Sequence, residues 1–270
     1  DQYLAGSQLN GWFAPNITPS NTGGIGDWSE DDLVAYLKTG HAKGRSQAAG
    51  PMGEAVEHST SHLTDEDLHA LAAFIKQVPA HDDDMEHQAR DSFGKALQEP
   101  DIRSGVVHQV GDLYEMGGAE LYDANCAACH GANGAGTADQ YVPSLYTNSV
   151  VGSGRPDNLI MTILEGVNRT TPSGHASMPS FGSHSDVQRL SDEEIARLVN
   201  YLTIRFGSGD HQVNAEQVAA MRQPRPAPAP ASASAPVPAP ATAAPATVAS
   251  PPAVPASGKE AAQPTPPEHP

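Results

Sequence analysis

Basic residues are scarce in this chain of 270 residues. It has 15 lysines and arginines against 32 aspartates and glutamates, which gives a formal net charge of −17. Such a surface repels phosphates, so a nucleic-acid ligand is disfavoured. Adsorption to an anionic membrane surface is disfavoured for the same reason. The charge is better explained by solubility or by a positively charged protein partner.

Long apolar runs are also missing. No stretch of about 18 apolar residues occurs, so nothing in the sequence predicts a membrane-spanning helix. The glycine fingerprint of a dinucleotide site is absent, and no convincing nucleophile–base pair is found. We therefore do not expect this chain to oxidise a substrate by itself.

Cysteine is limited to two residues, and both belong to the pentapeptide Cys126-Ala127-Ala128-Cys129-His130. C-x-x-C-H is the attachment pattern of c-type haem. Each thiol adds to a porphyrin vinyl group, and His130 is placed to bind the iron. A redox dithiol would need a βαβ pattern, and a zinc site would need more cysteines or paired histidines. The pattern predicts one covalent haem c and electron transfer.

A sixth iron ligand is expected from the loop that contains His175 and Met178. Met178 lies among small, polar and proline residues rather than on an apolar stripe, so we expect its thioether to be the ligand, with His175 as the rival. Pro143 follows the glycine-rich loop after the motif. Its carbonyl is a candidate acceptor for the free N–H of His130, although it could equally be an ordinary loop proline.

The chain repeats itself. Residues 32–40 resemble residues 158–166, and residues 63–68 resemble residues 190–195, in the same order and at nearly the same spacing. We interpret this as a duplicated domain. The spacing would place a first haem motif just before Asp1. Either the chain is cut inside a larger protein, which we favour, or the first domain has no haem. Met52 corresponds to Met178, so we expect it to be an axial ligand in the intact parent protein.

The predicted fold is all-α, with two tandem class I cytochrome c-like domains. Residues 1–80 form the first domain without its C-x-x-C-H, residues 81–108 an acidic linker, and residues 109–207 the second domain with its motif. Residues 208–270 form a linker and a disordered tail rich in Pro and Ala from residue 223 onward. Helices are predicted after the caps Ser29, Thr64 and Ser191, and over residues 111–125 and 158–167.

Several segments resemble a known family. Residues 11–18, 26–32 and 50–60 are similar to the second haem domain of the multi-haem cytochrome c subunit of bacterial membrane-bound alcohol, gluconate and related sugar dehydrogenases. The Cys126 motif and the Met178 loop resemble its third. The resemblance implies three haems and a location in the periplasm or on the periplasmic face of the inner membrane. It also implies electrons received from a flavin or quinoprotein dehydrogenase subunit and passed to quinone or a terminal oxidase.

The chain departs from this family by lacking two haem motifs and by ending in a long Pro/Ala tail, so haem count and membrane association stay open. Two other functions are considered: a freely diffusing periplasmic carrier, and a haem enzyme such as a peroxidase. Two further histidine groups, His58 with His62 and the stretch 81–87, are read as a poor helix and a solvated acidic linker rather than as metal sites.

Overall fold

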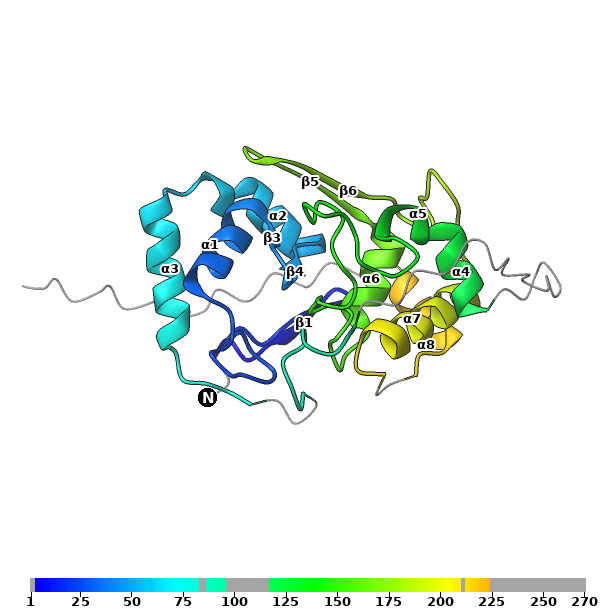
Figure 1. The fold of residues 1–270 in the computed structure, drawn as a ribbon, viewed down its shortest axis with the longest axis horizontal. Coiled ribbons are helices and arrows are strands. Elements are labelled where there is room, and N and C mark those ends of the chain that lie inside the picture. The colour runs from blue at the N-terminus through cyan, green and yellow to red at the C-terminus, as the bar shows by residue number, and fades with distance from the viewer. Residues whose placement is uncertain (1–2, 83–85, 96–116, 210–211, 224–270) are drawn as a thin grey trace, which may run out of the picture. The chain divides into compact units, whose positions relative to one another are not determined.

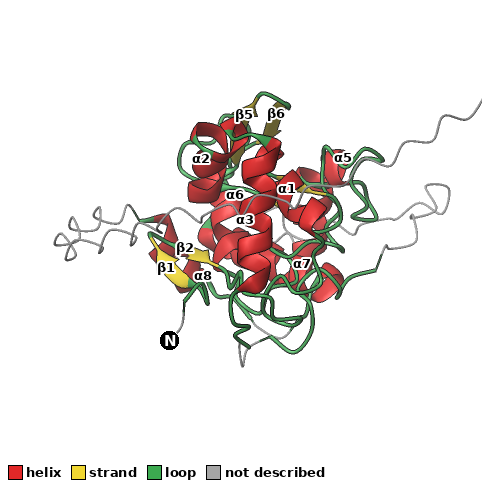
Figure 2. Cartoon of the chain, turned by 90° about the vertical axis from the view of Figure 1, so that its left-hand side faces the viewer, coloured by secondary structure: helices red, strands yellow, loops and turns green. Residues whose placement is uncertain are grey.

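Helices dominate the structure, a computed structural model that describes residues 3–82, 86–95, 117–209 and 212–223 (Figures 1 and 2). In chain order the elements are β1 (Ser7–Leu9), β2 (Trp12–Ala14), α1 (Glu30–Thr39), β3 (His41–Ala42), β4 (Ser46–Gln47), α2 (Gly50–His58), the 3-10 turn η1 (Thr60–His62), α3 (Asp65–Gln77), α4 (Gly118–Asn125), α5 (Ala127–His130), α6 (Asp157–Glu165), β5 (Val167–Thr171), β6 (Gly174–Met178), α7 (Asp192–Phe206) and α8 (Ala215–Arg222). The predicted linker over residues 208–222 is wrong at α8, because Val218 of this helix is buried in the apolar core. Residues 224–270 of the predicted tail and the predicted helical start at 111–116 lie outside the described residues.

The expectation of an all-α fold needs a correction. The strands pair as three antiparallel hairpins, β1–β2, β3–β4 and β5–β6. The predicted helix over residues 158–167 ends at Glu165, because Gly166 adopts φ +74° and the chain then enters β5. The described fold is therefore mainly helical with three small two-stranded sheets.

The predicted helix starts are present. The side chains of Ser29 and Ser191 each accept a hydrogen bond from the backbone N–H three residues on. The carboxylates of Asp32 and Glu194 in turn accept one from the backbone N–H of the cap residue. Thr64 caps α3 through the backbone N–H of Asp67. These reciprocal bonds satisfy amide groups that have no partner inside the helix.

We predict that Ser191→Ala lowers the free energy of unfolding by about 1 kcal/mol. The change removes the acceptor for Glu194 N, 3.2 Å away, while the apolar face of α7 stays intact. Urea unfolding monitored by circular dichroism measures the loss. Ser173→Ala, in the exposed turn between β5 and β6, is the control. Equal stability of the two variants would contradict the role of the cap.

The helix before the haem motif crosses the last predicted helix at very short range. A Cβ atom at Gly118 would lie 2.5 Å from the carbonyl oxygen of Arg197 and 2.5 Å from the Cβ of Tyr201. Tyr122 of α4 packs on Tyr201 and Phe206 of α7, with ring centroids 5.7 and 5.8 Å away. The close crossing of α4 and α7 therefore requires glycine at position 118.

Two apolar clusters lie in the described residues. The larger is built on α4, α6, α7 and α8, and the smaller contains Ile25, Trp28, Leu33, Ala42 and Ala72. In Figure 1, α1, α2 and α3, drawn in blue to cyan, group on one side, and α4, α5, α7 and α8 on the other. We call residues 3–82 the first half and residues 117–223 the second half.

The hairpin β1–β2 joins the halves. The side-chain amide of Asn158, in the first turn of α6, accepts from Phe13 N at 2.9 Å and donates to Phe13 O at 2.8 Å. The guanidinium of Arg155 lies 4.6 Å from the centre of the Phe13 ring. Trp12 is buried in the larger cluster although it belongs to the first half. The first half therefore contributes to the core of the second.

The predicted linker is not solvated throughout. Glu86, Arg90 and Asp91 are each less than a tenth exposed. Glu86 accepts hydrogen bonds from Gly154 N at 3.1 Å, and Asp91 pairs with Arg45 at 3.0 Å. The solvated interpretation of residues 81–87 is therefore wrong at Glu86. Residues 83–85 and 96–108 of the predicted linker lie outside the described residues.

None of the helices in the described parts of the chain is both long enough and apolar enough to cross a bilayer.

Candidate haem site

The two thiols are presented at a break between helices. Helix α4 ends at Asn125, and Cys126 caps it by donating its N–H to Tyr122 O at 2.8 Å. The single turn α5 then leads to His130. Cys126 is half-buried and Cys129 is exposed, and both are free thiols. Burial and the neighbouring Cys129 raise the pKa of the Cys126 thiol to about 12. Both side chains face the same cavity.

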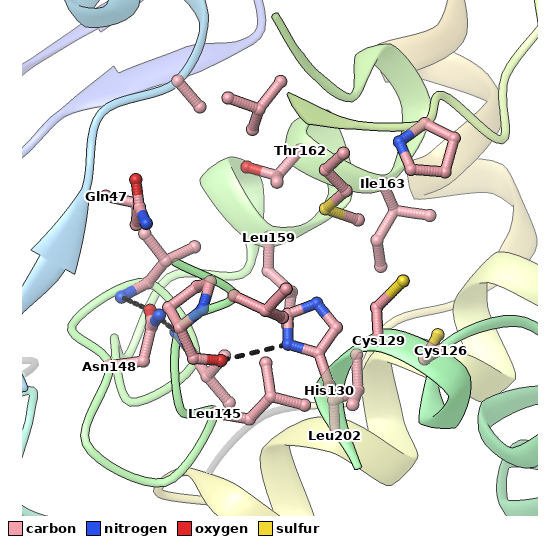
Figure 3. A pocket seen from close by; sticks show the side chains of 18 of the residues that line it. Gln47, Cys126, Cys129, His130, Leu145, Asn148, Leu159, Thr162, Ile163 and Leu202 are labelled. Carbon is pink, nitrogen blue, oxygen red and sulfur yellow. Dashed lines mark hydrogen bonds between the residues drawn. The ribbon is translucent and has the colours of Figure 1, made fainter. Parts of the chain in front are cut away.

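The imidazole of His130 is held by one hydrogen bond. Its Nδ1 lies 3.1 Å from the carbonyl oxygen of Pro143, as drawn in Figure 3. A carbonyl can only accept, so Nδ1 carries the proton and the lone pair is on Nε2. Burial lowers the pKa of His130, so the ring is neutral at pH 7. A neutral imidazole with a fixed tautomer is the form that binds iron.

The loop between His130 and Pro143 folds tightly against the core. Gly136 N donates to His130 O at 2.8 Å, which closes the loop at its start. Gly134 adopts φ +74°, and a Cβ there would lie 2.5 Å from the ring of Phe206. Glycine is needed at Gly134 for both reasons.

A large cavity opens in front of these residues. Its empty volume is about 1250 Å³ when the solvent at its mouth is included. Its walls are mostly apolar, with contributions from Leu145, Val151, Leu159, Ile163, Phe181 and Leu202. Ligand pockets commonly have apolar walls with few polar groups. This cavity has the lining of a site for a large, mostly apolar cofactor.

Met178 lines the cavity and His175 does not. The expected loop around Met178 is in fact the end of strand β6, with Met178 opposite Val167 of β5. His175 lies towards the turn of the hairpin, is exposed, and its Nδ1 is 3.2 Å from the hydroxyl of Thr170. The geometry therefore brings Met178, and not its rival, into the cavity with the C-x-x-C-H residues.

Residues of the first half also line the cavity. The sequence did not predict this contribution. Gln47 of β4 and Ala49 line it. Figure 3 shows Gln47 and Asn148 on the side of the cavity away from Cys126 and Cys129. No motif marks Gln47 or Ala49, because their role depends on how the first half folds back on the second.

The other candidate ligands lie elsewhere. Met52 is in the first turn of helix α2, after Pro51, and is not among the residues that line this cavity. It is in a helix, whereas the aligned Met178 is in a strand. His58 ends α2 and His62 is in η1. Within the described residues, no cluster of three or more His, Cys, Asp or Glu side chains could hold a metal ion.

The donor set fits haem c. Two free thiols, a neutral imidazole with Nε2 available and a thioether all border one apolar cavity. Fold and site together define a c-type cytochrome domain.

Comparisons with known proteins agree with the assignment to the c-type cytochromes. Residues 116–203 match the cytochrome c family. The chain is 41% identical to the fructose dehydrogenase cytochrome subunit of Gluconobacter japonicus over 227 residues, which cover 82% of this chain and 46% of that protein. It is 33% identical to the alcohol dehydrogenase (quinone) cytochrome c subunit of Gluconobacter oxydans (strain 621H), over 82% of this chain and 43% of that protein. It is 32% identical to the gluconate 2-dehydrogenase cytochrome c subunit of Pantoea cypripedii, over 82% and 48%.

The resemblance to cytochrome subunits of dehydrogenases is thereby confirmed. Haem c is the cofactor of the cytochrome c domain, and electron transfer through it is the function class of that domain. The chain spans less than half the length of these three relatives.

Proposed function

We propose that this chain carries electrons through one covalently bound haem c, as part of the cytochrome subunit of a membrane-bound dehydrogenase. Bound haem iron supplies a centre that alternates between the ferrous and ferric states. The observation that carries the proposal is the convergence of Cys126, Cys129, His130 and Met178 on one apolar cavity.

Each residue has a defined part in this proposal. Cys126 and Cys129 attach the cofactor, and His130 binds the iron through Nε2 while Pro143 fixes the imidazole ring. Met178 supplies the sixth ligand, and a thioether favours the ferrous state more than a second imidazole does. The apolar walls exclude water and favour the form with lower charge, which also raises the reduction potential.

We predict that Met178→Ala converts the low-spin haem into a form with an open or water-bound sixth position. The absorption spectrum of the ferric protein and the binding of carbon monoxide to the ferrous protein measure this change. His175→Ala is the matched control, because His175 is exposed on the same strand. An unchanged low-spin spectrum in Met178→Ala would remove Met178 as the ligand.

The same Met178 variant tests the second candidate function. A haem enzyme such as a peroxidase needs an open sixth position. Turnover of peroxide by the wild-type chain at a rate equal to that of Met178→Ala would favour the enzyme. The presence of Met178 in the cavity favours electron transfer.

The partner is proposed from the relatives. Each of the three is named as a cytochrome subunit of a dehydrogenase, for fructose, for an alcohol or for gluconate. A flavin or quinone-containing partner subunit would oxidise the sugar or alcohol on the periplasmic face of the inner membrane. It would pass electrons to this chain, and a quinone or terminal oxidase would receive them. Co-purification of the full-length protein with a dehydrogenase subunit separates this role from that of a free periplasmic carrier.

The domain organisation is also proposed. Residues 1–80 and 109–207 would be two cytochrome c-like domains joined by residues 81–108. Helix α8 packs on the core of the second before the tail that is predicted from residue 223. The separate clusters around Leu33 and Leu198 support this division. In the intact parent protein, Met52 would be the axial ligand of a further haem.

A further inference from the structure

The hairpin that carries Met178 has a single buried residue. Strands β5 and β6 contain five residues each, and only Arg169 is buried, with 3% of its surface exposed. A guanidinium is rarely buried to this degree unless it has specific partners. The hairpin is therefore attached to the first half through this charged side chain, together with a hydrogen bond from Thr170 N to Glu57 Oε2 of α2 at 3.2 Å.

The partners of Arg169 all belong to the first half. Nε donates to Thr39 O at 3.2 Å, one terminal nitrogen donates to Ala48 O, and the other donates to Gln47 Oε1 at 3.1 Å. Thr39 is the last residue of α1, where backbone carbonyls have no partner inside the helix and a positive charge is favoured. Arg169 thus satisfies acceptors that are more than 120 residues away in the chain.

The first half is shaped to receive this guanidinium. A Cβ atom at Gly40 would lie 2.3 Å from Nε and 2.4 Å from Cζ of Arg169. Gly40 also has φ +74°, which ends α1 and turns the chain away from the helix. Only glycine leaves room for Arg169 to reach the carbonyl of Thr39.

The register of the hairpin connects Arg169 to the cavity. Val167 pairs with Met178 and Arg169 pairs with Ala176. Residues two apart on a strand point to the same face, so Arg169 lies on the face that also carries Val167 and Met178. Val167, Ala176 and Met178 all line the cavity. On the other side of Met178, Phe181 N is bonded to Ile163 O at 2.9 Å, which ties the chain to α6.

We infer that Arg169 is a positioning residue for the Met178 thioether. It holds the hairpin against the first half, while the Phe181–Ile163 bond holds the other end, so that Met178 is fixed over the cavity. The inference rests on the proposed role of Met178 as the sixth ligand. It adds that the first half fixes the position of this thioether, because Thr39, Gln47 and Ala48 hold Arg169 in place.

The test compares Arg169→Gln, Arg169→Lys and Asn168→Ala in the full chain matured with haem. Asn168 is exposed on the opposite face of β5 and serves as the control. The readouts are the far-red band of a thioether bound to ferric iron, its loss on raising the pH, and the rate of carbon monoxide binding to the ferrous protein. Covalent haem content, measured as the pyridine haemochrome, shows that each variant has matured.

For Arg169→Gln we expect the band to disappear at a lower pH than in the wild type. We also expect carbon monoxide to bind about tenfold faster. This corresponds to a loss of about 1.4 kcal/mol in the free energy that keeps the thioether bound to the iron. Arg169→Lys keeps the charge but cannot reach three acceptors, so its effect should be intermediate. Should Arg169→Gln fail to accumulate, Arg169→Lys decides the question.

The outcomes separate the two proposals. If the wild type shows the thioether band and the Arg169 variants behave like Asn168→Ala, the positioning role is overturned while the ligand role of Met178 stands. If the wild type itself lacks the band, the ligand role fails first, and the positioning role fails with it.

Discussion

Replacing both Cys126 and Cys129 by alanine is expected to abolish covalent haem attachment completely. The chain contains no other cysteine, so no second thiol can take over. Haem staining of the denatured chain, after extraction of non-covalent haem with acidified acetone, measures the loss. Both thiols border the cavity, so each single variant should retain one thioether bond and shift the haemochrome band.

Haem that stays with the double variant after extraction would contradict the assignment of these thiols. His175→Ala is a suitable control, because it changes an exposed side chain and leaves the thiols in place. It should retain wild-type haem content.

Replacing Gly118 by valine is expected to lower the free energy of unfolding more than any other substitution proposed for this protein. The new Cβ would overlap the carbonyl of Arg197 and the Cβ of Tyr201, and neither atom can move without shifting α7. Overpacking of this kind costs about 1–3 kcal/mol even where the neighbours can adjust. Because α4 leads directly into Cys126, we also expect a lower yield of haem-loaded protein. Thermal unfolding followed by haem absorbance measures the change.

The neighbouring Gly117→Ala is the matched control. A Cβ at Gly117 would meet only the flexible carboxylate of Glu120, and its φ of −68° suits any residue. Its loss of stability should be a fraction of that of Gly118→Val. Similar losses in both variants would show that the close crossing of α4 and α7 is not what requires glycine.

Local signals in the sequence predicted the helices well. The caps Ser29, Thr64 and Ser191 sit where the helices begin, because a cap needs only a few neighbouring residues to form. The C-x-x-C-H pattern likewise indicated the cofactor, since its chemistry is contained in five residues.

The hairpins were not predicted. Strands β5 and β6 have five residues each, and the one buried side chain is the charged Arg169, so the sequence shows no alternation of apolar and polar residues. They are stabilised by contacts far away in the chain, which include those of Arg169 and the hydrogen bond of Thr170 N to Glu57. Sequence patterns do not report such contacts, and the Met178 segment therefore resembled a loop.

The sequence repeat predicted where the helices begin, but it did not predict the local structure around Met52 and Met178. Helices α1 and α6 correspond, as do α3 and α7, and each pair begins at nearly equivalent positions. Met52 and Met178 align in sequence but occupy a helix and a strand. Pro51 favours the first turn of a helix, which explains why the two segments diverge at this point.

The wall of the cavity that Gln47 and Ala49 provide has a consequence for how the two halves can vary. The second half takes part of the lining of its haem site from the first half. A substitution at Gln47 or Ala49 can therefore change the surroundings of the haem iron while every residue of the second half stays the same, so the two halves are not independent units for redox tuning.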